Sequence, residues 1–302
     1  MPCMNLSLPI RYVDPVFRPP SEAESLILPV TDGCSWNKCT FCEMYQAPQK
    51  RFRARDDAET LETLRHCGER FGSDIRRVFL ADGDALVLPT RRLLEIHRAI
   101  RQHLPAVRRV SSYCLPRNLR KKSVAELKEL ADAGLTMAYV GAESGDDEVL
   151  VKVHKGETFS SSCEALEKLQ QAGIKRSLMI LTGLGGRTLS RQHAENSARL
   201  VNAAQPEYLS TLVLNFPQGG ERFCSQFPEW QACNQSELFV EMEAFISALE
   251  LNRTVFRSDH ASNRLVLKGT LGAEKSRLLK EIRTAIVAPQ EAKLRPRRAL
   301  AL

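Results

Sequence analysis

The sequence predicts an α/β protein built on a parallel sheet. Its middle part alternates short apolar runs with amphipathic helical segments, and the strands recur every ~30–40 residues. One helix between consecutive strands favours right-handed βα units and therefore a parallel sheet. The 302 residues suffice for one large domain with an extension. Periodicity alone leaves both an open sheet and a barrel possible.

Six short apolar runs are expected to form the strands. Each is bounded by polar or glycine-containing segments, which is typical of strands buried on both faces of a sheet. The expected strands are 26–30, 77–81, 107–111, 137–141, 177–181 and 208–214.

The intervening segments have the apolar spacing of helices. Ser123 with Glu126 forms a capping-box pattern, and Ser161 with Glu164 is interpreted as a second one. Glycines and a proline mark the ends of these helices. The helices are expected over 90–104, 124–133, 162–172 and about 189–204.

Composition limits the class of protein. The chain is 43% hydrophobic and 26% charged, and no apolar run is long enough to cross a bilayer. Its start lacks a basic segment followed by an apolar core, so a secretory signal is not expected. Nine cysteines without an export signal predict a reducing cytoplasm, where cysteines serve as thiols or metal ligands.

Positive charge is concentrated in two runs. The net charge is +7, and the runs are 50–55 and 293–298. They form either ordinary solvated surface or a docking face for an acidic electron donor or for nucleic acid. The runs lack the regular aromatic interleaving of a nucleic-acid stacking platform. This observation counts against nucleic acid, which stays an alternative partner, and no membrane association is expected.

Three cysteines follow the first expected strand within one short loop. Cys34, Cys39 and Cys42 are too many for one disulfide and one short of the four ligands in a closed zinc site. They suit an iron–sulfur cluster in which three irons are held and one stays open. A structural zinc site and unrelated cysteines are the alternatives.

The C-x4-C-x2-C spacing, with Phe41 before the last cysteine, resembles the radical S-adenosylmethionine (SAM) superfamily. The commonest spacing there is C-x3-C-x2-C, so this loop is one residue longer. Within the superfamily, the chain resembles uncharacterised Fe–S oxidoreductases that are loosely similar to oxygen-independent coproporphyrinogen dehydrogenases. The resemblance extends from about Leu26 into the 280s.

The resemblance implies a partial (β/α)6 TIM-like barrel with its chemistry at the carboxyl ends of the strands. The expected organisation is an N-terminal extension over 1–25, the partial barrel over 26–217, and a small α+β C-terminal cap with a basic tail over 218–302. The cap is expected to close the open side of the barrel.

The resemblance also implies the cofactors. Cys34, Cys39 and Cys42 would hold a [4Fe–4S] cluster whose open iron binds SAM. Such enzymes cleave SAM reductively to a 5′-deoxyadenosyl radical, which abstracts hydrogen from an organic substrate, here unidentified. A flavodoxin- or ferredoxin-type protein would supply the electron.

Further SAM contacts follow from motifs at strand ends. Gly83 and Asp84 lie where the superfamily has a Gly-Gly-Glu-like motif for the methionyl ammonium, although Asp82 replaces the first glycine. Glu143 and Ser144 resemble a Gly-x-Glu-Ser run that contacts the ribose. An ordinary Asp-Gly turn is the alternative for residues 82–84.

Three more residues are candidates for SAM binding. Gly183 stands where the superfamily has a glycine-bearing motif along the adenine. Phe41 is expected to pack against either the adenine or the protein core. Lys155 either pairs with the SAM carboxylate or is solvated.

Two rival functions remain open. One is a non-catalytic metal-, cluster- or haem-binding protein, and the other is an RNA-modifying radical SAM enzyme. Cys3, Cys224 and Cys233 lack CxxC spacing, so no second cluster is expected. His260 is either a proton donor near the substrate or a structural histidine.

Overall fold

A computed structural model describes residues 10–296. It contains one eight-stranded sheet with the order β1-β4-β5-β6-β7-β8-β9-β10 and a separate pair of strands, β2 and β3. The bounds are β1 (Leu26–Pro29), β2 (Thr31–Asp32), β3 (Arg53–Ala54), β4 (Arg77–Ala81), β5 (Arg109–Cys114), β6 (Leu135–Glu143), β7 (Lys175–Thr182), β8 (Tyr208–Val213), β9 (Thr254–Ser258) and β10 (Leu267–Leu271).

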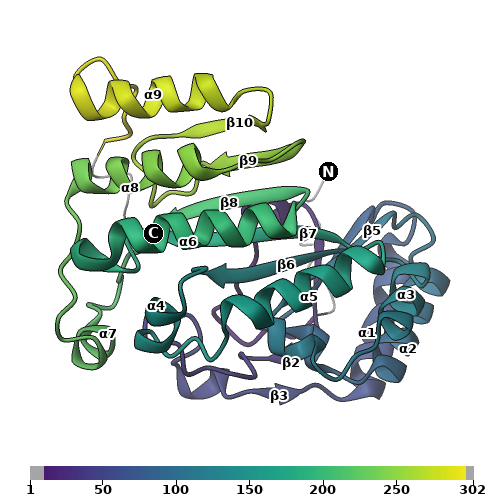
Figure 1. Cartoon of the computed structure of the whole chain (residues 1–302). Coiled ribbons are helices and arrows are strands. Elements are labelled where there is room, and N and C mark those ends of the chain that lie inside the picture. Colours follow the sequence, from purple (N-terminus) through teal and green to yellow (C-terminus); the bar gives the residue numbers. More distant parts are fainter. Residues whose placement is uncertain (1–9, 297–302) are drawn as a thin grey trace, which may run out of the picture.

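The predicted α/β class and the six parallel strands are confirmed. From β1 to β9 every neighbouring pair in the large sheet is parallel, and only β10 runs antiparallel to β9. Within the described residues β1 and β10 are not paired, so the sheet stays open. This arrangement is a partial barrel, and the ribbon curves accordingly (Figure 1).

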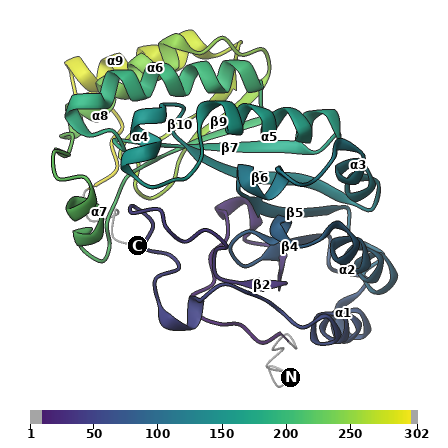
Figure 2. The same cartoon turned by 60° about the horizontal axis from the view of Figure 1, so that its bottom comes forward.

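Most of the helices form a layer along one face of the curved sheet, while the N-terminal segment and the cysteine loop lie on the other side (Figure 2). The helices are α1 (Asp57–Phe71), α2 (Thr90–His103), α3 (Val124–Asp132), α4 (Asp147–Lys152), α5 (Phe159–Gln171), α6 (Gly186–Ala204), α7 (Glu221–Gln226), α8 (Gln235–Ala248) and α9 (Lys275–Val287). No helix among residues 10–296 has the length and apolar composition of a membrane span.

One predicted capping box is confirmed and the other is wrong. Ser123 and Glu126 cap α3 reciprocally. The cap of α5 is instead Thr158, whose hydroxyl accepts the N–H of Ser161 at 3.1 Å. The helix therefore begins before the predicted position. The side chain of Asp147 stabilises this earlier start by accepting the N–H of Phe159 at 2.6 Å.

The two faces of the sheet pack differently. On the helix-covered face, Leu178 and Ile180 of β7 join the main hydrophobic core beneath the helices. On the opposite face, Phe79 and Tyr139 form a smaller cluster, and Phe79 meets Tyr113 edge-on at 5.1 Å between ring centroids. Because successive strand residues point to opposite faces, Leu178 and Ile180 indicate which residues of β7 face the helices and which face the cysteine loop.

The C-terminal part of the chain extends the same sheet. β9 pairs with β8 over Tyr208–Ser210, and β10 follows it. Helix α8 packs between α6 and α9 in the helix layer. The segment that the sequence assigns to a cap is thus joined to the partial barrel by strand pairing.

Candidate active site

The three loop cysteines lie close together at the carboxyl ends of the strands. All three are free thiols, and Cys39 is buried. Burial raises the pKa of Cys34 and of Cys39 to about 11. Charge on Cys39 also raises the pKa of Cys34, Cys42 acts on Cys39 in the same way, and Cys34 acts on Cys42. The loop therefore gathers three thiols that repel one another when ionised.

The donor set consists of three cysteine thiols, and thiolates are the usual ligands of iron–sulfur clusters. In a [4Fe–4S] cluster each cysteine binds a different iron, so the sulfurs need not meet at one point. Three thiols in one loop match a cluster that keeps one iron open.

Asp84 ties the cysteine loop to the end of β4. One carboxylate oxygen accepts the N–H of Ser35 at 2.7 Å, and the other accepts the Ser35 hydroxyl and the Asn118 amide, the latter at 2.8 Å. The side chain is fully buried, and burial raises the pKa of Asp84. The predicted site residue is therefore at the cysteine loop, with both carboxylate oxygens already hydrogen-bonded.

Gly83 lets the end of β4 approach the cysteine loop. Its φ is +56°, and a Cβ at this position would lie 1.9 Å from the carbonyl oxygen of Gly33. Its N–H donates to the hydroxyl of Tyr45 at 3.2 Å. The glycine is required by contact between backbones, whatever ligand the site takes.

Asp82 lies directly before Gly83, and its two carboxylate oxygens have different surroundings. One carboxylate oxygen pairs with the ammonium of Lys50 at 2.6 Å, and both side chains are buried. The other oxygen, Oδ1, is buried without a hydrogen-bond partner among the described residues. Lys50 is thus a buried structural cation, and the expectation that the whole 50–55 run forms an exposed basic surface is wrong.

Glu143 and Lys155 form a buried ion pair beside the cysteines. Lys155 Nζ lies 3.1 Å from Glu143 Oε1. Burial alone lowers the pKa of Lys155, but Glu143 and Cys39 reverse this and raise it. The Glu143 backbone has a φ of +66°, and a Cβ at position 141 would lie 2.2 Å from its carboxylate. Gly141 therefore makes room for the carboxylate.

Two other predicted site residues have partners within the protein. The Ser144 hydroxyl is 2.8 Å from Nδ1 of His193 and accepts the N–H of Asp146 at 2.9 Å. The N–H of Gly183 donates to Glu241 at 2.6 Å. Both residues stand at the carboxyl ends of strands, as predicted, and their hydrogen bonds connect those ends to α6 and α8.

Phe41 packs against a hydrophobic cluster that includes Val149 and Val153 at the end of α4. The ammonium of Lys155 lies 5.9 Å from its ring centroid. Phe41 therefore has a core-packing role in this structure and also borders the group of charged residues beside the cysteines.

Several residues of the site have no motif in the sequence that reveals them. Ser35, Tyr45 and Asn118 all contact the end of β4. Arg117 stacks on Trp36, with its guanidinium carbon 3.5 Å from the ring centroid. In the sequence, the only indication of their role is that they lie in the cysteine loop or in the segment that follows β5.

The remaining candidates lie elsewhere. His260 Nδ1 is 2.9 Å from the Ser262 hydroxyl, and burial lowers the pKa of the ring. Cys224 is exposed and Cys233 half-buried, and both are free thiols. Cys3 lies outside the described residues.

Comparisons with known proteins agree with this architecture. Residues 28–201 match the family model described as the Radical SAM superfamily. The heme chaperone HemW of Bacillus subtilis (strain 168) is 22% identical over 182 residues, which cover 58% of this chain and 47% of HemW. The chain thus spans about half the length of this curated relative.

Solved structures show the same fold. Coproporphyrinogen III oxidase (HemN) from Escherichia coli, a radical SAM enzyme, superimposes with a TM-score of 0.57 at 15% identity, covering 74% of this chain and 52% of HemN. The radical SAM methyltransferase TsrM from Kitasatospora setae superimposes with a TM-score of 0.53 at 20% identity, covering 64% of this chain and 35% of TsrM. Because the family model covers more than half of the sequence, the chain belongs to the radical SAM superfamily.

Proposed function

We propose that the chain is a radical SAM enzyme that holds a [4Fe–4S] cluster through Cys34, Cys39 and Cys42. When bound, the cluster supplies the electron that cleaves SAM to methionine and a 5′-deoxyadenosyl radical. The observation that carries the proposal is the gathering of three free thiols with Asp84, Glu143 and Lys155 at the carboxyl ends of parallel strands. In barrels of this kind that end carries the chemistry.

The charged groups have distinct proposed roles. Lys155 offsets negative charge on the cysteine thiolates, because its ammonium lowers the pKa of Cys39 and of Cys42. The same ammonium is suited to pair with the carboxylate of SAM, and Glu143 to accept a ribose hydroxyl.

Asp82 is the acceptor that we assign to the SAM ammonium. Asp84 already uses both oxygens to hold Ser35 and Asn118. Oδ1 of Asp82 is buried without a partner among the described residues, which is costly unless a ligand or water satisfies it. Asp84 and Gly83 are then positioning residues for the cysteine loop.

The substrate is proposed to be a small organic molecule bound on the aromatic inner face of the sheet. That face presents Phe79, Tyr113 and Tyr139 to the side on which the cysteine loop lies. A flavodoxin- or ferredoxin-type donor would deliver the electron. Since Lys50 is buried, the exposed part of the basic run available to such a donor reduces to Arg51 and Arg53.

The test is anaerobic reconstitution with iron and sulfide, followed by SAM and dithionite. We expect 5′-deoxyadenosine from the wild type and none from Cys42→Ala. Cys163→Ala is the matched control, because Cys163 is a free thiol on α5 outside the cysteine loop. A reconstituted cluster that yields no 5′-deoxyadenosine, with or without a substrate library, would contradict the proposal.

A haem-binding role is the second candidate. It is favoured by the similarity to HemW, which is described as a heme chaperone. This role predicts stoichiometric haem binding by the purified chain, with SAM recovered intact. Absorbance titration with haemin, run alongside the 5′-deoxyadenosine assay, separates the two functions.

A further inference from the structure

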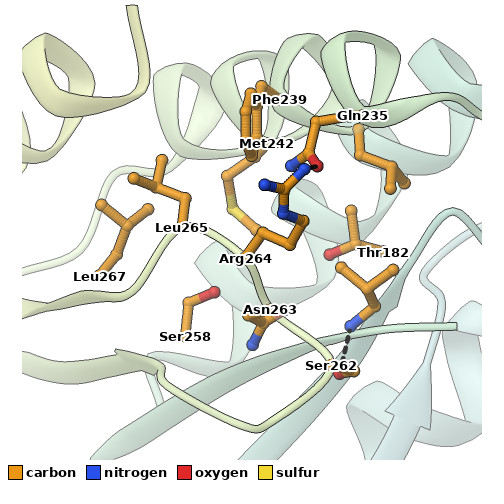
Figure 3. Close-up of a pocket in the computed structure, with 12 residues that line it drawn as sticks. Thr182, Gln235, Phe239, Met242, Ser258, Ser262, Asn263, Arg264, Leu265 and Leu267 are labelled. Atoms are coloured by element: carbon orange, nitrogen blue, oxygen red, sulfur yellow. Dashed lines mark hydrogen bonds between the residues drawn. The ribbon is translucent and has the colours of Figure 1, made fainter. Parts of the chain in front are cut away.

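A cavity lies between α8 and the sheet, away from the cysteines. Its volume is about 440 Å³, within the range of small-molecule pockets. Its walls are mostly apolar, with Leu238, Phe239 and Met242 contributed by α8 and Leu265 and Leu267 by the segment opposite (Figure 3).

The sheet separates this cavity from the cysteine loop. Thr182 of β7 lines the cavity and lies on the same face as Ile180, which packs beneath the helices. The preceding residue, Leu181, faces the other way and packs in the cluster that contains Phe41. A molecule in the cavity would therefore be on the opposite side of the sheet from Phe41 and the cysteines.

Arg264 places a positive charge on the cavity wall. Its guanidinium donates to the carbonyl of Arg295 at 3.2 Å and to the side-chain oxygen of Gln235, both neutral acceptors. Among residues 10–296 it forms no ion pair, and Nη2 has no acceptor. Figure 3 shows the guanidinium reaching from its loop towards Gln235, next to Met242 and Phe239. A half-buried cation against apolar side chains favours an anionic partner.

Asn263 adds a buried acceptor to the same wall. Its amide nitrogen donates to the carbonyl of Thr211 at 2.7 Å, whereas Oδ1 is buried and has no partner within the described part of the chain. The residue is 3% exposed. An unsatisfied buried oxygen in a cavity wall is an attachment point for a donor on a ligand.

We propose that this cavity is a binding site for a small amphipathic carboxylate. The apolar body would lie against Leu238, Met242 and Leu265, and the carboxylate would pair with Arg264. A hydroxyl or amide donor on the molecule would satisfy Asn263 Oδ1. The site is independent of the cluster and of SAM, since the sheet lies between them.

Octanoate and 3-phenylpropionate are suitable carboxylate probes, with octylamine as the charge-reversed comparison. Binding to the full chain is measured by titration calorimetry, both without and with the reconstituted cluster. We expect saturable binding of at least one carboxylate in both forms, and none of octylamine. Chemical shifts of carbon-labelled methionine methyl groups should single out Met242.

Three variants test the assignment. Arg264→Gln should weaken carboxylate binding about tenfold or more, since a charge-assisted hydrogen bond is lost. Arg264→Lys should restore most of it. Arg257→Gln is the matched control, because Arg257 is exposed on the neighbouring strand and does not line the cavity. Equal binding of octylamine, unchanged affinity in Arg264→Gln, or no saturable carboxylate binding would overturn the proposal.

Discussion

The carboxylate of Asp84 accepts the backbone N–H of Ser35 at 2.7 Å, which joins the end of β4 to the residue that follows the first cysteine. Strand β1 pairs directly with β4. The cysteine loop therefore begins after one strand and is held by a residue that follows its neighbour in the sheet. The position of the thiols therefore depends on a residue that is distant in sequence and ligates nothing itself.

Asp84→Ala should loosen the cysteine loop. The change leaves the N–H of Ser35 and the amide of Asn118 without an acceptor, at a cost of about 1–3 kcal/mol for each buried group. We expect lower iron content after anaerobic reconstitution and a lower urea midpoint. Asp132→Ala, at an exposed position on α3, should change neither quantity. Equal iron content in both variants would contradict the anchoring role.

Two glycine variants separate backbone strain from steric contact. Gly83 and Gly173 both have positive φ values, +56° and +76°, but a Cβ at 173 meets nothing within 4 Å. Gly173→Ala should therefore cost only the strain of about 1–2 kcal/mol. Gly83→Ala should cost more and also reduce cluster loading, because its Cβ would collide with Gly33. Urea unfolding and iron analysis of the two variants compare these effects directly.

Breaking the Glu143–Lys155 pair should be strongly destabilising. Lys155→Met leaves the buried carboxylate without its cation, which typically costs about 3–5 kcal/mol. Adding Glu143→Gln to this variant should recover part of the loss, because the uncompensated charge is removed. Urea unfolding of the cluster-free protein measures both. If the double variant is as unstable as Lys155→Met, the charge is not the cause.

His97 should make folding stability depend on pH. Burial lowers the pKa of this histidine from 6.5 to about 4 in the folded protein. Between these values the unfolded chain binds a proton that the folded chain does not, so stability is lost as the pH falls from 6.5 towards 4. The expected loss is roughly 3 kcal/mol at 1.36 kcal/mol per pKa unit.

The His97→Leu variant provides the control for that pH dependence. Leucine has a similar volume and cannot titrate, so the unfolding free energy of the variant should vary less between pH 6.5 and 4. If the unfolding free energy of His97→Leu depends on pH as strongly as that of the wild type, groups other than His97 cause the dependence.

Local patterns in the sequence were sufficient to predict the six parallel strands and one helix cap. The apolar runs located β4 at its observed bounds and the other five strands to within a few residues, because a buried strand needs a continuous apolar stretch. The Ser123 capping box was equally local. The start of α5 was misplaced because Thr158 and Ser161 both have capping chemistry, and Asp147, from a preceding helix, favours the earlier position.

The sequence by itself determined the α/β class and the positions of six strands, because buried strands need apolar runs at regular intervals. The superfamily followed from the resemblance of the cysteine loop and the strand-end motifs to known members. Only the tertiary structure decided which carboxylate at the end of β4 has both oxygens hydrogen-bonded and which has one oxygen without a partner among the described residues. It likewise decided that Lys50 is buried against Asp82. It also placed Arg264 in an apolar cavity on the far side of the sheet. These properties arise from contacts between residues far apart in the chain, which no local pattern encodes.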